Sequence, residues 1–296
     1  MVKNHNAGRM DTMELLILGS AAAEGIPALF CRCPLCRRAQ ALGGRDLRAR
    51  CGALVNGHIL VDLPPDIYHA KLCYGLDLAA VDVLLNTHAH ADHFAPAELA
   101  MRSSRYYCHI PGEQPLQAFL VPESLERARQ AFAFEFGGES SDPSVKLLPV
   151  NAFDRVDCGE VIAWALPACH DPALTCLFWL LVEPATRTAF LYAHDTGLPS
   201  PDTLRELHRL LDGMVLDGVS MDCTWGTLPH SDGSHMGLAD NLEFRRLLLK
   251  QGSAGPLTRW YVNHFSHNCG LTHAELSARF GQEGFSVLYD GARINL

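Results

Sequence analysis

The sequence lacks the features that mark membrane, secreted or general nucleic-acid-binding proteins. No apolar run approaches the roughly 20 residues that a membrane-spanning helix needs. Residues 1–11 are polar and have no apolar core of the kind found in signal peptides. Acidic residues number 33 against 24 basic ones, so the net charge of -9 should repel phosphate backbones and anionic membranes. We therefore expect a cytoplasmic protein without a membrane partner, and a nucleic-acid role would require a local basic patch.

Internal repeats and low-complexity tracts are also missing, and the cysteines do not suggest a disulfide framework. The number of cysteines is odd, 11, and several stand singly in apolar surroundings, such as Cys73 and Cys169, as reduced core cysteines do. Only Cys31, Cys33 and Cys36 form a cluster. The chain has 296 residues, of which 48% are apolar, and this is enough to bury a large core.

The hydrophobic pattern predicts strands in groups, each group followed by helices. The expected strands are 15–18, 53–55, 58–61, 81–85, 161–166, 176–182, 189–192, 214–216, 260–262 and 287–289, with a hairpin turn at Asn56-Gly57. The expected helices are 122–136, one after Ser200-Pro201, 237–249, and one capped by Thr272 and Glu275. This order favours two sheets enclosed by helical layers. We expect a flexible extension over residues 1–12 and a single domain over 13–296, with an insertion or lid at about 102–150.

A histidine-rich run follows the strand predicted at 81–85. His88 and His90 can reach one metal ion from an extended loop, and Asp92 and His93 offer further ligands from the first turn of a helix. Imidazole and carboxylate are the usual ligands of zinc, manganese and iron at hydrolytic centres. A polar surface loop without ligands is the alternative, but functional sites concentrate where strands end.

Residues 87–93 match a T-H-x-H-x-D-H signature, and the chain from Leu15 to Asp290 resembles the metallo-β-lactamase superfamily. The resemblance implies an α/β fold, a four-layer αβ/βα sandwich. It also implies a dinuclear site: His88, His90 and His170 would hold the first ion, Asp92, His93 and His264 the second, and Asp195 would bridge them. A hydroxide between the ions would be the nucleophile, so Asp92 would be needed for catalysis as well as for metal binding.

Each distant member of this set also has a structural interpretation. Taken singly, His170 or His264 could be a core histidine with satisfied hydrogen bonds, and Asp195 a cap or turn residue. Asp62 resembles the superfamily aspartate that orients a histidine ligand. His194 is expected to have no ligand role.

The cysteine cluster predicts a second kind of metal site. Cys31, Cys33 and Cys36 supply three thiolates within one tight loop, which is the spacing of a structural zinc site that needs one more donor. His267 is the candidate, because it would tie this loop to the segment that carries His264. Three free thiols are the alternative.

The stretch from Gly19 to Cys36 is similar to the PhnP-like phosphodiesterases of the bacterial carbon–phosphorus lyase pathway. It also resembles PqqB, a superfamily member with a like cysteine loop whose active-site metal motif is degraded, whereas the motif here is intact. The PhnP-like resemblance implies that His267 is the fourth structural zinc ligand, that His235 is a catalytic general acid, and that the protein is a homodimer. The alternative for His235 is a histidine at a helix N-terminus without a role.

The leading expectation is therefore a dinuclear-metal hydrolase, a phosphodiesterase acting on small cyclic or nucleotide-like anionic substrates. It would hold two catalytic divalent ions, zinc, manganese or iron, and one structural zinc. A lactone or thioester hydrolase is the nearest alternative, because the same hydroxide attacks an acyl carbon. A tRNA-processing nuclease is disfavoured by the acidic charge, and a non-catalytic PqqB-like carrier by the complete ligand set. A basic strip, solvated or substrate-attracting, comprises Arg32, Arg37, Arg38, Arg45, Arg48 and Arg50.

Overall fold

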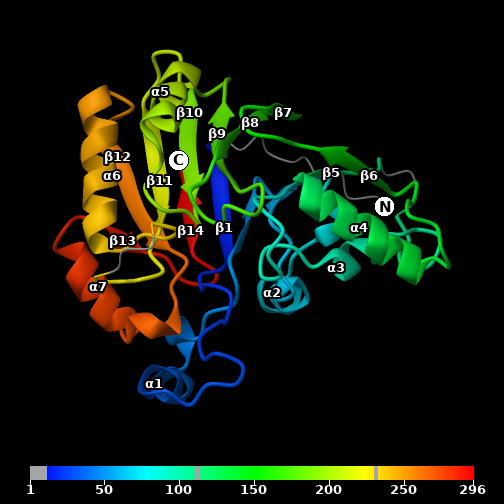
Figure 1. The fold of residues 1–296 in the computed structure, drawn as a ribbon, viewed down its shortest axis with the longest axis horizontal. Coiled ribbons are helices and arrows are strands. Elements are labelled where there is room, and N and C mark those ends of the chain that lie inside the picture. Colours follow the sequence, from blue (N-terminus) through cyan, green and yellow to red (C-terminus); the bar gives the residue numbers. More distant parts are fainter. Residues whose placement is uncertain (1–11, 111–113, 230–232) are drawn as a thin grey trace, which may run out of the picture.

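Two seven-stranded sheets form the centre of the computed structural model, which describes residues 12–110, 114–229 and 233–296 (Figure 1). The first sheet contains, in spatial order, β14 (Arg293–Asn295), β1 (Glu14–Gly19), β2 (Gly52–Val55), β3 (Ile59–Val61), β4 (Val83–Leu85), β5 (Leu116–Leu120) and β6 (Val145–Pro149). The second contains β13 (Ser286–Val287), β12 (Ala254–Asn263), β11 (Leu216–Asp222), β10 (Thr188–Ala193), β9 (Leu177–Glu183), β8 (Val161–Pro167) and β7 (Arg155–Cys158).

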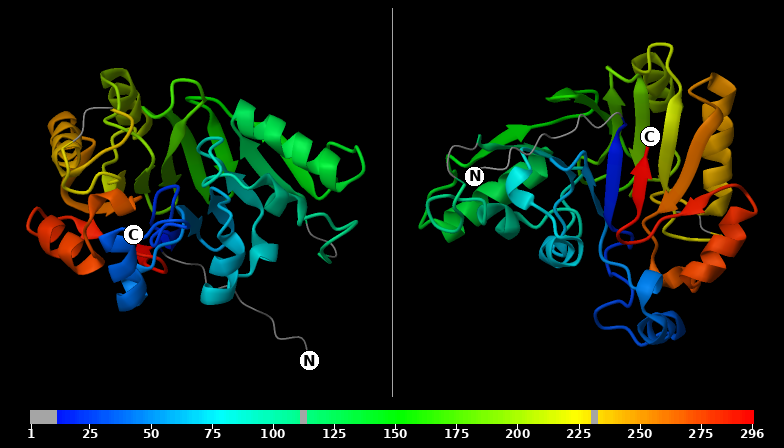
Figure 2. Two further views of the ribbon diagram at one scale, coloured as in Figure 1. Left: turned by 60° about the horizontal axis from the view of Figure 1, so that its bottom comes forward. Right: turned by 180° about the vertical axis from the view of Figure 1, so that it is seen from behind.

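Helices cover the outer face of each sheet. Their bounds are α1 (Pro34–Leu42), α2 (Ile67–Tyr74), α3 (Pro96–Ala100), α4 (Pro122–Glu135), α5 (Pro201–Leu210), α6 (Leu238–Gln251) and α7 (His273–Gly281). Helices α2, α3 and α4 pack on the first sheet, and α5, α6 and α7 on the second. Figures 1 and 2 show α1 projecting from one end of the sandwich. Within the described ranges, no helix combines the length and the apolarity that a membrane span requires.

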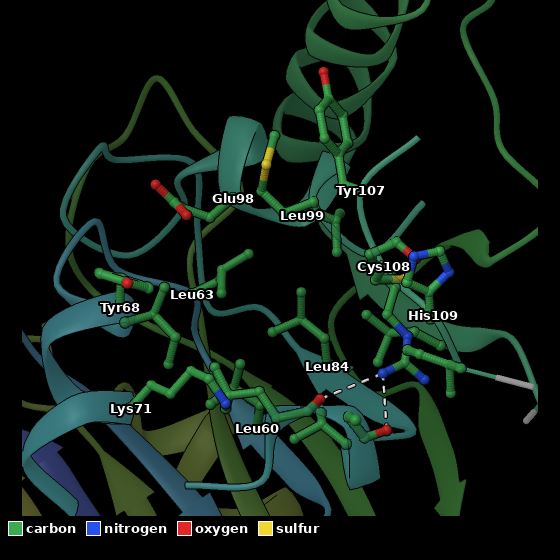
Figure 3. Close-up of a pocket in the computed structure, with 18 residues that line it drawn as sticks. Leu60, Leu63, Tyr68, Lys71, Leu84, Glu98, Leu99, Tyr107, Cys108 and His109 are labelled. Atoms are coloured by element: carbon green, nitrogen blue, oxygen red, sulfur yellow. Dashed lines mark hydrogen bonds between the residues drawn. The ribbon is translucent and has the colours of Figure 1, made fainter. Parts of the chain in front are cut away.

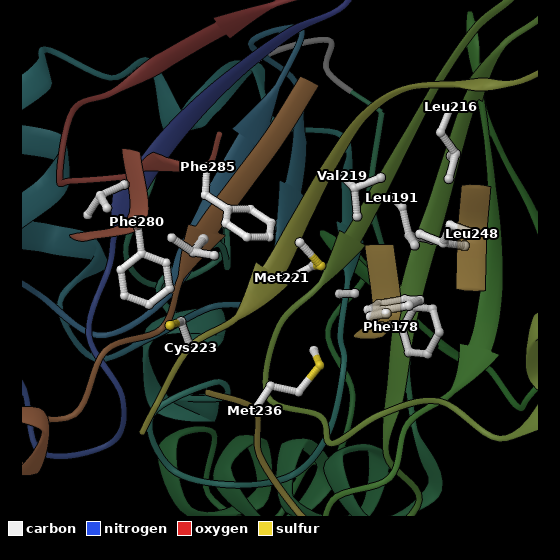
Figure 4. Packing of buried hydrophobic residues seen from close by; sticks show 14 of the residues in the cluster. Phe178, Leu191, Leu216, Val219, Met221, Cys223, Met236, Leu248, Phe280 and Phe285 are labelled. Atoms are coloured by element: carbon white, nitrogen blue, oxygen red, sulfur yellow. The ribbon is translucent and has the colours of Figure 1, made fainter. Parts of the chain in front are cut away.

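Strand β9 shows why the sandwich is stable. All seven of its residues are buried, and alternate side chains point to opposite faces, as they do in any strand. Phe178, Leu180 and Val182 join the core under the outer helices, part of which Figure 4 shows. Trp179 and Leu181 join the core between the two sheets. A third core lies between the first sheet and its own helices. The expected αβ/βα sandwich is thus confirmed.

Most predicted elements form, but two regions differ from expectation. The strand expected at 214–216 instead runs from Leu216 to Asp222, and its small and polar residues hid it. Gly218 lies against Phe190, since a Cβ there would meet the Phe190 ring at 2.8 Å. The region 102–150, where we expected an insertion or lid, contains a strand–helix–strand unit, in which β5 and β6 extend the first sheet by parallel pairing. The extension predicted at 1–12 falls almost wholly outside the described residues.

Candidate metal centre

The histidine-rich loop begins where β4 ends and is fixed by Asp62, which follows β3. The Asp62 carboxylate accepts a hydrogen bond from the Thr87 backbone N–H at 2.8 Å. It also lies 2.7 Å from Nδ1 of His93. Because the contact with Asp62 engages one ring nitrogen, Nε2 of His93 is left to face the cluster of donors described next. Asn86 donates to the carbonyl of His88 at 2.8 Å and shapes the same loop.

Three groups of donor atoms meet at Asp195. The first consists of His88, His90, His170 and Asp195, the second of Asp92, His93, Asp195 and His264, and the third of Asp195, Asp222, His235 and His264; within each group the donor atoms lie within 4.8 Å of one another. In the first group, Nε2 of His88 is 3.0 Å from the Asp195 carboxylate. In the second, Nε2 of His93 is 3.1 Å from the same carboxylate. The structure therefore brings together all seven residues that the sequence nominated as dinuclear ligands.

The donor set fits divalent cations. The Nε2 atoms of His93 and His264 are buried and make no hydrogen bond within the described residues. Buried polar atoms rarely lack a hydrogen bond, so two of them facing the Asp195 carboxylate indicate a ligand. Imidazole and carboxylate donors with this spacing suit zinc, manganese or iron.

The protonation states of Asp195 and His170 favour ligation as well. Burial alone would raise the pKa of Asp195, but His264, His235 and His88 outweigh burial and hold the pKa of this carboxyl well below its usual range. Burial and the neighbouring rings of His88 and His235 lower the pKa of His170 to about 4, despite Asp195. An ionised carboxylate and a neutral imidazole are the forms that bind metal.

The backbone is strained at three positions of the centre. Asp62, Asp195 and His264 have φ angles of 62°, 53° and 61°, in the left-handed region that glycine adopts readily. Each follows the end of a strand within two residues. For a non-glycine residue this conformation costs roughly 1–2 kcal/mol. Non-glycine residues at these strained positions therefore indicate that their side chains have a function other than stabilising the fold.

A second cluster joins the N-terminal loop to the segment after β12. Cys31, Cys33, Cys36 and His267 have donor atoms within 4.8 Å of one another. Nδ1 of His267 lies 3.5 Å from Sγ of both Cys33 and Cys36. Burial disfavours the thiolate of Cys33, but hydrogen bonds from Cys36 and His267 lower its pKa to about 6. Soft thiolates and one imidazole at this spacing fit a structural zinc ion.

His235 adjoins the main centre, and Asp222, at the end of β11, holds it. Nδ1 of His235 is 3.1 Å from the Asp195 carboxylate and 3.3 Å from that of Asp222. Fully buried Asp222 also lies 3.1 Å from Nδ1 of His264. Burial opposes a charged imidazole, yet the contacts with Asp195 and Asp222 raise the pKa of His235 to about 10. Asp222 was missed from the sequence, where its only signal is its position at the end of a strand.

Comparison with known proteins identifies the family. Residues 58–251 match the beta-lactamase superfamily domain. The chain belongs to this superfamily. Proteins of this fold are generally hydrolases and the family binds divalent metals, which agrees with the donor groups found here.

Solved structures of superfamily members share the fold over most of the chain. A new diphosphatase of the PhnP family is 20% identical, with a TM-score of 0.70, and the match covers 96% of this chain and 98% of that one. Zinc-bound PqqB from Methylobacterium extorquens is 16% identical, with a TM-score of 0.66 and coverage of 96% and 100%. In sequence, coenzyme PQQ synthesis protein B of Methylobacterium nodulans is 34% identical over 105 residues, 31% of this chain and 35% of that protein. The chain spans at most 35% of the length of the curated relatives that it matches.

Three further polar residues singled out in the sequence, His194, Arg48 and Arg50, form hydrogen bonds or ion pairs within the fold. His194 is in none of the donor groups: its Nδ1 lies 3.2 Å from Sγ of Cys51 and its Nε2 lies 2.6 Å from Oγ of Ser220. The expected basic strip is broken up, because Arg48 is buried and donates to the Leu288 carbonyl at 2.8 Å, and Arg50 pairs with Asp66 at 2.8 Å.

The structure also contains an apolar pocket of about 610 Å³ on the outer side of the first sheet (Figure 3). Leu63, Leu84 and Leu99 form part of its wall, and Lys71 and Arg102 also line it. None of the superfamily's donor residues lines this pocket.

Proposed function

We propose that this protein is a dinuclear-metal phosphodiesterase that acts on small anionic phosphodiesters, cyclic or nucleotide-like. The observation that carries the proposal is the sharing of Asp195 by the first and second donor groups, with His235 in contact with the same carboxylate. The similarity in fold to a diphosphatase of the PhnP family supports it. We also propose a homodimer without a membrane or nucleic-acid partner.

The residues assigned to metal are those that the structure brings together. His88, His90 and His170 would hold one ion, Asp92, His93 and His264 the other, and Asp195 would contact both; Cys31, Cys33, Cys36 and His267 would hold a structural zinc. Two divalent ions in such a centre supply an activated water molecule and offset charge on the phosphoryl oxygens.

The remaining steps belong to the side chains around the centre. Asp62 fixes the ring of His93, and Asp222 fixes the ring of His264. Asp222 also keeps His235 protonated at neutral pH, so that His235 can act as the general acid. When the bond between phosphorus and the leaving oxygen breaks, His235 donates its proton to that oxygen, and the oxygen of water remains on phosphorus. The products are a phosphomonoester and an alcohol.

Metal content and substrate preference together test the proposal. We expect freshly purified protein to hold near three ions per chain by plasma mass spectrometry, Cys33→Ser to lose zinc, and Asp92→Ala to lose a catalytic ion together with activity. We expect hydrolysis of bis-p-nitrophenyl phosphate and none of homoserine lactones. Preference for lactones would overturn the phosphodiesterase assignment in favour of an acyl hydrolase. Retention of at most one ion, unaffected by Asp92→Ala after metal supplementation, would overturn the dinuclear assignment.

A further inference from the structure

Two hollows border the first donor group, and Leu174 lies between them. One, of about 460 Å³, is lined by residues that include His170, Thr175 and Ser234. The other, of about 690 Å³, is lined by residues that include His90 and Pro122. Leu174 lines both hollows, so its side chain forms their common wall. A substrate that reaches the centre therefore has two directions in which to place its substituents.

The first hollow lies on the side of the general acid. It is lined by Ser234, the residue before His235. The backbone carbonyl of Ser234 is 3.3 Å from Nδ1 of His170. The rings of His170 and His235 are 4.8 Å apart, centre to centre. Because Ser234 precedes His235 in the chain and His170 contacts the His235 ring, we place a leaving oxygen that takes a proton from His235 on the side of this hollow.

The second hollow is bounded by the start of α4, and its walls are largely apolar. Ala89, Ala91, Pro122 and Leu174 supply apolar surface. Its charged side chains are Glu123, Glu126 and Arg127. Arg127 donates a hydrogen bond to the carbonyl of Ala89 and keeps its positive charge, but the two carboxylates outnumber it, so the charge of the lining disfavours an anionic substituent.

Helix α4 also fixes the loop that carries Leu174. The Glu123 carboxylate accepts hydrogen bonds from the backbone N–H of Thr175 at 3.2 Å and from its hydroxyl at 3.3 Å. Since Arg127 holds the histidine-rich loop and Glu123 holds the Leu174 loop, α4 sets the width of the hollow between them. A wall fixed from both sides can discriminate by shape.

We propose that the hollow beside α4 receives the ester group that stays on phosphorus, and that this group is uncharged and apolar. The leaving group occupies the hollow beside Ser234, and Leu174 is a specificity-determining residue at the boundary. This inference rests on the proposed phosphodiesterase function and narrows it, because it restricts the substrates to acyclic diesters with one apolar alcohol. The retained group does not change during the reaction, so its contacts with Leu174 act on KM more than on kcat.

Two diesters with the same leaving group test the inference. Methyl p-nitrophenyl phosphate and phenyl p-nitrophenyl phosphate both release p-nitrophenolate and differ only in the retained group. After division by the uncatalysed rates, we expect kcat/KM of metal-loaded wild type to favour the phenyl diester by about tenfold or more. Leu174→Asp should bring this ratio close to one through a higher KM, and Leu174→Met, the matched control, should keep it.

The outcomes distinguish failure of the phosphodiesterase function from failure of the inference about the retained group. Hydrolysis of neither diester by fully metal-loaded wild type would overturn the phosphodiesterase function and the inference with it. Hydrolysis of both diesters with equal corrected kcat/KM would overturn the inference alone. Wild type supplies this second result by itself, so the test does not depend on the folding of Leu174→Asp. If wild type and Leu174→Asp contain equal amounts of metal, a lost preference for the phenyl diester is due to the change at Leu174.

Discussion

Replacing Asp222 with Asn should shift the pH dependence of hydrolysis, because this carboxylate holds the proton of His235. Asp222 lies 3.3 Å from Nδ1 of His235, and the pKa of His235 stands at about 10 in contact with Asp222 and Asp195. When Asp195 is engaged by a cation, Asp222 is the carboxylate that remains for His235. The Asn variant keeps the shape of the side chain and removes its charge.

The size of the shift follows from the energy of that contact. A hydrogen bond to a charged group contributes roughly 1.5–3 kcal/mol. Since one pKa unit corresponds to about 1.4 kcal/mol, Asp222→Asn should lower the pKa of His235 by about one to two units. A general acid must be protonated to act, so the alkaline limb of kcat/KM against pH should move to lower pH by the same amount.

The assay is the pH profile of bis-p-nitrophenyl phosphate hydrolysis by wild type and Asp222→Asn, with metal content measured on the same samples. Because Asp222 also lies 3.1 Å from Nδ1 of His264, only fully loaded samples are compared. His235→Ala is the control and should be slow and lack this alkaline limb. An unmoved limb in a fully loaded Asp222→Asn enzyme would refute the assignment of Asp222 as the partner of His235.

Three further predictions concern stability. Cys33→Ser should lose about one zinc per chain and melt at a lower temperature, as zinc analysis and calorimetry can measure; unchanged zinc would refute the structural site. In metal-free protein, the free energy of unfolding in urea should be higher for Asp195→Gly than for Asp195→Ala by up to about 1 kcal/mol, because glycine adopts a φ of 53° without strain. Equal urea midpoints for the two variants would contradict backbone strain at this position. Burial lowers the pKa of His58, but Asp82 and Glu160 outweigh burial and raise it above its ordinary value of about 6.5. The stabilisation by His58 is thus complete below about pH 6.5 and lost as pH rises through the folded pKa. His58→Gln should weaken urea stability by up to about 1 kcal/mol at pH 5.5, and less at pH 8.5, and equal losses at both would contradict the linkage.

The sequence nominated the residues of the main centre from recognisable positions, and the structure brings their donor atoms together. His88 and His90 share one motif, and His170, Asp195 and His264 follow predicted strands in the expected order. The four layers were also predictable, since strands and helices alternate in groups.

What the sequence did not reveal depends on contacts between distant segments. Asp222 is an unremarkable aspartate until β11 and β12 pair side by side and bring it to His264. Strand β11 was underestimated because Gly218 and Ser220 are not apolar, although the chain between Leu216 and Asp222 is largely buried. The left-handed conformation of Asp195 leaves no trace in the sequence, because it is set by the fold around it.

The shared carboxylate of Asp195 couples metal binding to protonation. Its carboxylate belongs to the donor groups of both proposed ions and also supports the proton on His235. Binding at one position therefore changes the charge available at the other, and this linkage must be reciprocal. A cation that engages Asp195 weakens its hold on the proton of His235, so loading should lower the pKa of His235 and should strengthen as pH rises through that pKa. Metal loading and acid strength at this centre are properties of one coupled equilibrium.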